Sequence, residues 1–429
     1  MKKILLHCLV LCSSALWAQP GGSLDTATFN SPIPGFNATC PDVNGDVRCI
    51  VNQGSQYLVG GNISLSSCTP KSLIRINANG TVDNTLNTGT GFQHINYTNN
   101  NYTTNGVIQT IIYDAQAQKI YVGGHFNRYN GVITFNNGIA LRNIVRLNLD
   151  GSLDQSFTPS INYDITVSKM LKQPDGKILF CGNATSFSTK IIWRLLADGS
   201  EDVAFNNLVP KSTEIEGLPR GYGYDIAIQP STGKILIGGN FIITSPESGN
   251  QNTHFTVVNK GFVRLNTDGT LDTGFAKPFM HNQYQYFMNV YQLHLTQDEF
   301  IVIVGAFDNC FGTARNNYAK LKPNGELDIN YYNDTSISVG GLASKMQSNE
   351  KVLFDSYESD KDGYRVRRFN TDGTLDTCFD SNFTTDPGTH YITAITLQSD
   401  ENTILVGGRR FKVGQGLNTR YSIAKLKNN

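Results

Sequence analysis

The chain lacks an excess of charge of either sign, and beyond its first residues it lacks long hydrophobic runs. It has 35 basic and 35 acidic residues in a length of 429. The basic patch typical of a nucleic-acid-binding protein is therefore not expected. No apolar run long enough for a membrane helix follows the N-terminal segment. These absences argue against a nucleic-acid partner and predict a mature chain without a transmembrane segment.

Short motifs that mark common catalytic and metal sites are also missing. The sequence contains no C-x-x-C or H-E-x-x-H spacing, no G-x-S-x-G nucleophile elbow and no P-loop. We therefore expect no catalytic residue, no metal and no cofactor, and a non-enzymatic protein is favoured. One alternative stays open, a carbohydrate-active hydrolase or lyase that uses loop carboxylates, because tertiary structure sets the separation of such acids.

The first eighteen residues predict export. Met1-Lys2-Lys3 precedes an apolar stretch from Ile4 to Leu11, and Ala18 offers a cleavage point. This apolar stretch is too short to cross a bilayer. Residues 1–18 are interpreted as a signal peptide and residues 19–429 as one mature domain. The expected location is secreted or at the cell surface, with the periplasm as an alternative.

Few cysteines remain after the signal peptide, and export permits them to form disulfides. Cys40, Cys49 and Cys68 cluster in the first part of the mature chain. We predict a disulfide between Cys40 and Cys49, with Cys49–Cys68 as the alternative. Cys181 and Cys378 lie within strand patterns and are expected to be buried thiols.

One short pattern recurs along the whole chain. It is clearest in the stretch from Arg264 to Phe275, Arg-Leu-Asn-Thr-Asp-Gly-Thr-Leu-Asp-Thr-Gly-Phe. The repeats are spaced by roughly 48 to 71 residues, which is the size of a four-stranded propeller blade. The glycines that anchor the copies are Gly22, Gly80, Gly151, Gly199, Gly269, Gly325 and Gly373.

A basic residue lies five positions before every anchor glycine except Gly22, Lys425 takes the equivalent place in the last repeat, and an aspartate lies three positions after every anchor glycine. The residues between them are typical of a three-residue hairpin loop with a left-handed glycine, which places base and acid opposite each other. We therefore predict structural ion pairs rather than catalytic acids. The pairs are Arg75 with Asp83, Arg146 with Asp154, Arg194 with Asp202, Arg264 with Asp272, Lys320 with Asp328, Arg368 with Asp376, and Lys425 with Asp25.

Each repeat is predicted to contain four strands, A to D, and the third repeat shows them most clearly. Strand A is expected over Ile165 to Gln173 and strand B over Lys177 to Gly182. Strand C carries the base, and strand D runs from the anchor region to Phe205. Alternating apolar residues and Gly, Asn and Asp at the boundaries indicate strands throughout, so no helix is predicted after residue 18.

The two ends of the chain complement each other. The last repeat stops after strand C, at Ser422 to Asn429, while the mature N-terminus begins with Gly22-Ser23-Leu24-Asp25, which belongs to a strand D. Pairing these segments would remove two exposed sheet edges. The fold class predicted is all-β, a seven-bladed β-propeller of four-stranded blades, closed by the N-terminal strand that completes the last blade.

A family resemblance rests on two of these segments. The run Lys-Ile-Leu-Ile-Gly-Gly-Asn-Phe from Lys234 to Phe241, followed by the Arg264 to Phe275 motif, resembles the delta-60 repeat family of secreted bacterial β-propellers. The resemblance covers essentially the whole mature chain. It implies a propeller fold and export, and it implies no general catalytic activity.

Insertions fall in the D–A and B–C connections, which lie on the same rim of the ring. They are rich in aromatic and amide side chains, which suit stacking on sugars or packing on a peptide. The alternative is that the rings only hold their own loops in place. The residues predicted to bind a ligand are His94, Tyr97, Tyr102, Tyr222, Tyr224, His281, Tyr284 and Tyr286.

The function predicted from the sequence is recognition. We expect a monomeric, exported binding or scaffold module whose partner is an extracellular glycan or protein, bound on the rim that carries the long connections. A second alternative is a structural component of a cell-surface assembly, without a small ligand.

Overall fold

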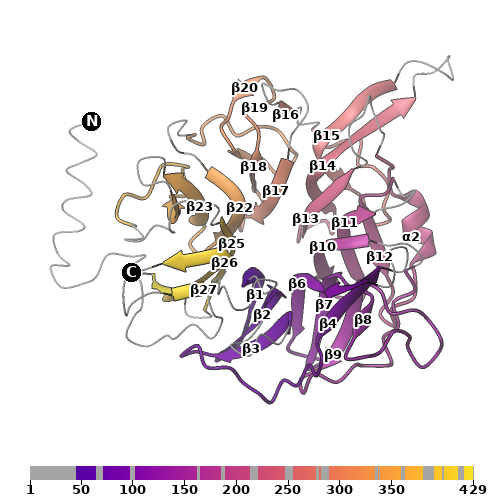
Figure 1. The fold of residues 1–429 in the computed structure, drawn as a ribbon. Coiled ribbons are helices and arrows are strands. Elements are labelled where there is room, and N and C mark those ends of the chain that lie inside the picture. Colours follow the sequence, from indigo (N-terminus) through magenta and orange to yellow (C-terminus); the bar gives the residue numbers. More distant parts are fainter. Residues whose placement is uncertain are drawn as a thin grey trace.

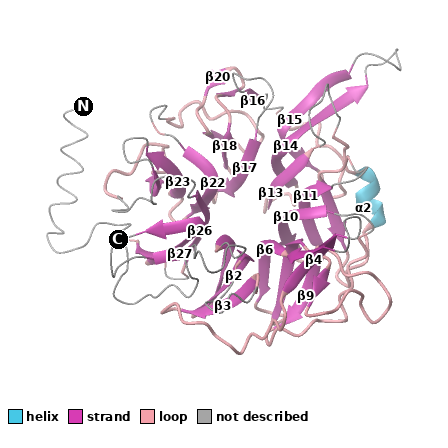
Figure 2. Ribbon diagram, viewed as in Figure 1, coloured by secondary structure: helices cyan, strands magenta, loops and turns pink. Residues whose placement is uncertain are grey.

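The structure is a computed structural model of the chain. It describes residues 45–63, 71–96, 102–161, 165–184, 189–212, 221–246, 255–276, 280–281, 289–333, 337, 339–358, 363–379, 391–398, 401–413 and 420–428. These residues form strands and turns almost throughout (Figure 2). The predicted signal peptide, the segment Gly22 to Asp25 and Cys40 lie outside the described residues.

Seven three-stranded antiparallel sheets repeat along the described chain and surround a common centre (Figure 1). In each sheet the strands lie side by side in chain order. The sheets are β1 (Asp46–Gln53), β2 (Gln56–Asn62), β3 (Leu73–Asn77); β6 (Val107–Asp114), β7 (Lys119–His125), β9 (Ile144–Asn148); β10 (Ile165–Lys172), β11 (Ile178–Ala184), β12 (Ile192–Leu195); β13 (Tyr222–Ile228), β14 (Ile235–Pro246), β15 (Phe255–Leu265); β17 (Asn289–Leu295), β18 (Ile301–Ala306), β21 (Tyr318–Leu321); β22 (Val339–Met346), β23 (Val352–Glu358), β24 (Gly363–Phe369); and β25 (Tyr391–Leu397), β26 (Thr403–Val413), β27 (Arg420–Lys427).

Two insertions that the sequence suggested were loops contain strands of their own. The first forms a small sheet of β5 (Tyr102–Asn105), β4 (Phe92–Asn96) and β8 (Arg128–Tyr129), and the second forms one of β16 (Met280–His281), β19 (Asn309–Cys310) and β20 (Thr313–Ala314). A third insertion lengthens β14 and β15 into a hairpin that projects from the ring (Figure 1).

The predicted fourth strand is not present as a strand in the described residues. Beyond each anchor glycine the chain makes one antiparallel bridge, such as Leu265 to Leu271, and then turns, because the amide of Phe275 donates back to the carbonyl of Asp272 at 3.3 Å. The turn itself has the predicted geometry. The anchor glycines from Gly80 to Gly373 have φ between 86° and 98°.

One helix corrects the expectation of none. In the third repeat, residues Val203–Leu208 form α2 at the place where strand D was expected. The carboxylate of Asp202 accepts a hydrogen bond from the amide of Phe205 at 3.3 Å and so caps the first turn. An aspartate that was predicted to serve only an ion pair therefore also starts a helix.

A β-bulge in the first strand of each repeated sheet explains the glycines of the second strand. In β10 the register shifts between Val167 and Lys169, opposite Gly182. A Cβ atom at Gly182 would lie 2.1 Å from the carbonyl oxygen of Thr166, so the bulge leaves no room for a side chain. These glycines therefore serve strand packing.

The core lies between adjacent sheets, and the first and last sheets share one part of it. Val47 and Ile50 of β1 pack in the same buried cluster as Ala394 of β25 and Leu405 of β26. The side chain of Asn52 also donates to the carbonyl of Leu397 at 3.3 Å. Contacts therefore join the two ends of the described ring, whereas the predicted N-terminal closing strand lies outside the described residues.

Candidate functional site

Five of the predicted ion pairs are present in the third strands of their sheets. In each of them the Nε atom of the arginine lies beside the Oδ2 atom of the aspartate. The distances are 2.7 Å for Arg75–Asp83, 2.9 Å for Arg146–Asp154, 2.8 Å for Arg194–Asp202, 2.7 Å for Arg264–Asp272 and 2.8 Å for Arg368–Asp376.

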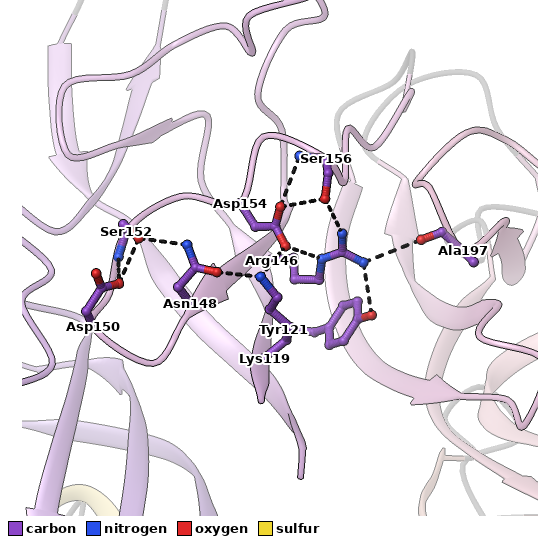
Figure 3. A network of polar contacts seen from close by, with 9 residues as sticks. All are labelled: Lys119, Tyr121, Arg146, Asn148, Asp150, Ser152, Asp154, Ser156 and Ala197. Atoms are coloured by element: carbon purple, nitrogen blue, oxygen red, sulfur yellow. Dashed lines mark hydrogen bonds and ion pairs between the residues drawn. The ribbon is translucent and has the colours of Figure 1, made fainter. Parts of the chain in front are cut away.

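Figure 3 shows how one such pair joins two neighbouring sheets. Besides Asp154, Arg146 donates to the hydroxyl of Ser156 at 2.8 Å and to the carbonyl of Ala197, in the next repeat, at 3.5 Å. Its guanidinium lies 4.8 Å from the centre of the Phe157 ring. Burial acts to raise the pKa of Asp154, but the contacts with Ser156, Lys119 and Arg146 lower it by more. The pKa is therefore below its usual value, and the carboxyl stays ionised.

Sequence analysis missed a second cation at most of these aspartates. Lys119 lies 2.9 Å from Asp154, and the lysine that precedes the second strand of three other sheets contacts the equivalent carboxylate. The available signal was the lysine at the start of four of the Ile- or Val-rich runs. The further pairs are Lys177–Asp202, Lys234–Asp272 and Lys351–Asp376.

Two predicted pairs differ from this pattern. Lys320 forms no ion pair with Asp328 within the described residues; its ammonium lies 4.9 Å from the ring centre of Phe300 and 5.6 Å from that of Tyr331. A lysine has one compact ammonium and cannot reach carboxylate and ring together as an arginine fork does. Asp25, the predicted partner of Lys425, lies outside the described residues.

The predicted disulfide of Cys49 is not formed. Cys49 is a free thiol on β1, where it lines the inside of the ring, and burial raises the pKa of its thiol to about 12. Cys181 is a buried free thiol, as expected.

Of the residues predicted to bind a ligand, three can be placed with their side chains: His94, Tyr222 and Tyr224. His94 stacks on His125, with ring centres 4.0 Å apart. Tyr222 stacks on Tyr224 at 6.4 Å. Tyr102 begins β5 and His281 ends β16, and Tyr97, Tyr284 and Tyr286 lie outside the described residues.

A third ring, which sequence analysis missed, extends the tyrosine pair. Tyr291 of β17 lies 5.3 Å from Tyr224, so Tyr222, Tyr224 and Tyr291 form one cluster across two neighbouring sheets. Burial raises the pKa values of Tyr224 and Tyr291 above the usual range, and both hydroxyls therefore stay protonated. We call these three residues the first tyrosine cluster.

The next two sheets carry a second tyrosine cluster. Tyr364 lies 5.3 Å from Tyr357 and 5.2 Å from Tyr391, at the ends of β23, β24 and β25 that meet the B–C and D–A connections. Sequence analysis missed these rings because they lie in strands rather than in insertions. Their positions at strand ends next to the long connections could have marked them as candidates.

The first strands of all seven repeated sheets line a central cavity of about 550 Å³, which we call the channel. Its size lies in the range of small-molecule sites. Tyr224 of the first tyrosine cluster contributes to the lining, so that cluster reaches the channel. The ionisable residues among the lining are Arg48, Cys49, Lys169, Tyr224, Asp225, His294 and Lys345.

Asp225 is the only carboxylate among the described lining residues. One oxygen accepts from its neighbour Ile226 at 2.9 Å and lies 3.2 Å from the ammonium of Lys169, and the other accepts from the amide of Leu293 at 2.9 Å. Asp225 therefore ties together β10, β13 and β17. A carboxylate with these contacts holds the ring together.

His294 faces β22 across the channel wall. Its Nε2 atom lies 2.7 Å from the hydroxyl of Ser344, which also donates to Gln292 at 3.3 Å. The pKa of His294 is lowered to about 4, by burial first and also by the charges of Lys345 and Lys169, against the opposing effect of Asp225. The imidazole is therefore neutral at physiological pH.

A second buried carboxyl lies behind the tyrosines. Asp355 occupies a position where other sheets have glycine, and the bulge of β22 wraps around it, so that a Cβ atom at Gly340 would lie 2.0 Å from its Oδ2 atom. Its Oδ1 atom accepts from the amide of Ala343 at 3.0 Å. Burial raises its pKa to about 7, although amides of the bulge lower it.

Two further observations concern the part of the chain that the structure describes. No group of three or more His, Cys, Asp or Glu side chains is arranged there to hold a metal ion. No described helix has the length and apolar character needed to cross a bilayer.

Comparison with known proteins supports a β-propeller repeat family. Five segments match the family described as "Domain of unknown function (DUF5122) beta-propeller", over residues 119–157, 173–205, 231–275, 300–328 and 347–379. Each segment covers the second and third strands of a repeated sheet and the turn that follows. No curated protein matches the chain.

Solved structures resemble the chain only distantly. The extracellular domain of BT4673 from B. thetaiotaomicron is 14% identical with a TM-score of 0.47, over 94% of this chain and 40% of that one. The chain thus spans less than half the length of that protein's structure. XC5397 from Xanthomonas campestris, a gluconolactonase, is 12% identical with a TM-score of 0.34, over 96% and 99% of the two chains. Neither likeness carries weight for function.

Proposed function

We propose that the chain is an exported, monomeric β-propeller that binds an extracellular saccharide without transforming it. In this proposal the seven repeated sheets are seven blades of a delta-60-type propeller, and the N-terminal segment completes the last blade. The ligand lies on the rim that carries the D–A and B–C connections. Such a protein would serve as a binding or scaffold module at the cell surface or in the surrounding medium.

One observation carries the proposal. Two tyrosine clusters, of three rings each, lie at the variable ends of strands in four consecutive sheets, and the first cluster reaches the polar channel. Tyrosine rings offer flat apolar faces to a sugar while their hydroxyls form hydrogen bonds, at a small loss of side-chain entropy. Rings that served only their own loop would not be expected to gather across sheets.

A glycan array probed with the purified chain tests this proposal. We expect one class of glycan to bind, and Tyr224→Ala and Tyr364→Ala to weaken that binding by about tenfold or more, as for a central contact residue. Tyr113→Ala is the matched control, because Tyr113 lies on the opposite rim, near the end of β6. The proposal fails if no glycan binds, or if the cluster variants bind as tightly as the control.

An assay for new reducing ends on the same glycans distinguishes binding from hydrolysis. A glycosidase requires two carboxylic groups. Among the described lining residues the channel offers Asp225 alone, and that carboxylate already bonds to Lys169 and two amides. We expect binding without product. Turnover that is lost on replacing an acidic residue of the long connections would instead establish the enzyme.

A further inference from the structure

Lys345 is a cation inside the channel for which the described residues provide no counter-ion. It lies on β22, next to Ser344, and its side chain lines the channel and also a neighbouring cavity of about 510 Å³. It forms no hydrogen bond or ion pair with any described side chain, although it retains a large exposed surface inside the ring. Because its ammonium is exposed to the channel and contacts no described anion, this lysine is available to an anionic ligand that enters the channel.

The nearest acids are already engaged. Asp225 is bound to Lys169 and to two backbone amides. Glu401, which borders the neighbouring cavity, accepts from the amide of Ser348 at 2.8 Å and from its hydroxyl at 2.9 Å. Asp225 thus balances one of the two lysines, and the channel retains a positive charge.

The electrostatic effects within the channel agree with this imbalance. Burial lowers the pKa of Lys345, and the charge of Lys169 lowers it further, although Asp225 and Glu401 oppose the shift. The pKa of His294 is lowered by burial first and then by the same two lysines. His294 and Lys345, on β17 and β22, therefore both experience the positive charge of a nearby lysine, whereas Asp225 raises the pKa of Lys169 on β10.

Hydrogen-bonding groups line the same channel as the unpaired cation. Ser344 precedes Lys345 on β22, and His294 lies on β17 of the neighbouring sheet. The Oγ atom of Ser344 is 2.7 Å from the Nε2 atom of His294. We propose that the channel is a binding site for a small oxyanion, a carboxylate or a phosphate-type group, held by Lys345 with Lys169, Ser344 and His294 around it. Charge-assisted hydrogen bonds from lysine are the usual means of holding such groups.

This site does not depend on the tyrosine clusters. A free oxyanion would occupy the channel whether or not a saccharide binds at the rim, and a sugar that carries an acid group would engage both places. The probes are therefore inorganic phosphate and acetate, which have no ring to stack on tyrosine. Failure of glycan binding would leave this inference untouched, and failure of anion binding would leave the saccharide proposal untouched.

The experiment is an NMR titration of the purified full chain labelled with 13C-histidine, in which His294 is assigned with the variant His294→Gln. Sodium phosphate and sodium acetate are added at pH 7, with sodium chloride at equal ionic strength as the reference. We expect the His294 resonance to shift in a saturable manner with at least one oxyanion. Saturation with phosphate alone, or with acetate alone, identifies the type of group.

Three variants test the role of Lys345. Lys345→Met should weaken anion binding by about tenfold or more, the effect of one lost charge-assisted hydrogen bond. Lys345→Arg should retain binding, and Lys322→Met, at an exposed lysine paired with Glu326, should leave it unchanged. Absence of a saturable shift with both oxyanions overturns the proposal, as does binding by a folded Lys345→Met variant that equals binding by the parent.

Discussion

The charged residues of the third strands and those of the channel follow opposite rules. In the third strands the same arginine and aspartate recur in five sheets, with the same Nε–Oδ2 contact each time. In the channel no charged pair recurs from sheet to sheet, and Lys345 has no described partner. The two regions belong to the same sheets and differ only in the strand that carries the charge.

This difference separates residues that build the ring from residues that use it. A contact that links each sheet to the next must be repeated, because every interface needs it. A ligand site needs one constellation, so its residues need not repeat. Repetition along the sequence therefore indicates a structural role, and departures from it at the first strand indicate a binding role.

The largest effect should come from breaking one repeated pair. Arg264 contacts Asp272, the side chain of Gln229 and the carbonyl of Pro323, each at 2.7 Å. We expect Arg264→Met to lower the free energy of unfolding by about 3–5 kcal/mol, because it leaves buried partners unpaired. Urea denaturation measures this change.

Lys320 provides the matched comparison for that variant. It occupies the same repeat position but contacts rings rather than Asp328. Lys320→Met should cost about 1 kcal/mol or less. Equal losses for the two variants would contradict the structural role of the arginine pairs.

The second effect depends on pH. Burial raises the pKa of folded Asp355 to about 7, whereas an aspartate in an unfolded chain has a pKa of about 3.9. The stability that this group contributes is thus full below about pH 4 and is lost as the pH rises through about 7. Between pH 4.5 and 8 the parent should lose about 3 kcal/mol relative to Asp355→Asn.

Urea unfolding of both chains at several pH values checks this difference. The paired aspartates have the opposite shift: the pKa of Asp272 is below its usual value, so its contribution is present above about pH 4 and does not change in this window. Parallel stability curves for parent and Asp355→Asn would show that Asp355 is ionised in the folded chain.

A third prediction concerns the repeated turn. Gly151 has φ 90°, and a Cβ atom there would lie 2.5 Å from the carbonyl oxygen of Asn87 in the preceding repeat. Gly54, with φ 73°, has nothing within 4 Å of such an atom. Both Gly→Ala changes carry the cost of a left-handed alanine, about 1–2 kcal/mol. Gly151→Ala should cost about 1–3 kcal/mol more, measured by urea denaturation, because it adds a collision. Equal costs would mean that the repeats do not approach closely at this turn.

The smallest effect should have the opposite sign. Lys345→Met removes an unpaired cation from the channel, so we expect a gain in stability of about 0.5–1 kcal/mol in buffer free of oxyanions. Lys322→Met, on the surface, should change little. The gain should shrink when phosphate is present if phosphate binds the parent. A loss of stability in Lys345→Met would place Lys345 among the structural charges.

The repeat made much of the architecture predictable. The pattern around Arg264 and Gly269 established the sheet order, the left-handed glycines and the cross-strand pairs, because hairpin geometry places residues at fixed offsets opposite each other. It failed where tertiary contacts compete with local pattern. Asp202 caps α2, and Lys320 contacts the rings of Phe300 and Tyr331 instead of Asp328. After each repeated turn the chain forms a single antiparallel bridge rather than a full strand.

The candidate site was much less predictable. The sequence pointed to Tyr222 and Tyr224, since they follow an insertion. It gave no reason to join them to Tyr291, nor Tyr364 to Tyr391, because residues of different repeats become neighbours only when sheets pack. The role assigned to Lys345 was hidden for the same reason.

The sequence by itself determined that this protein is built from repeated β-sheets, since each repeat carries its own turn, strands and ion pair within a short span of chain. Only the tertiary structure decided what surrounds the centre of the ring. Each sheet contributes a few residues of its first strand to the channel, and their charges balance or fail to balance only as a sum over seven distant segments.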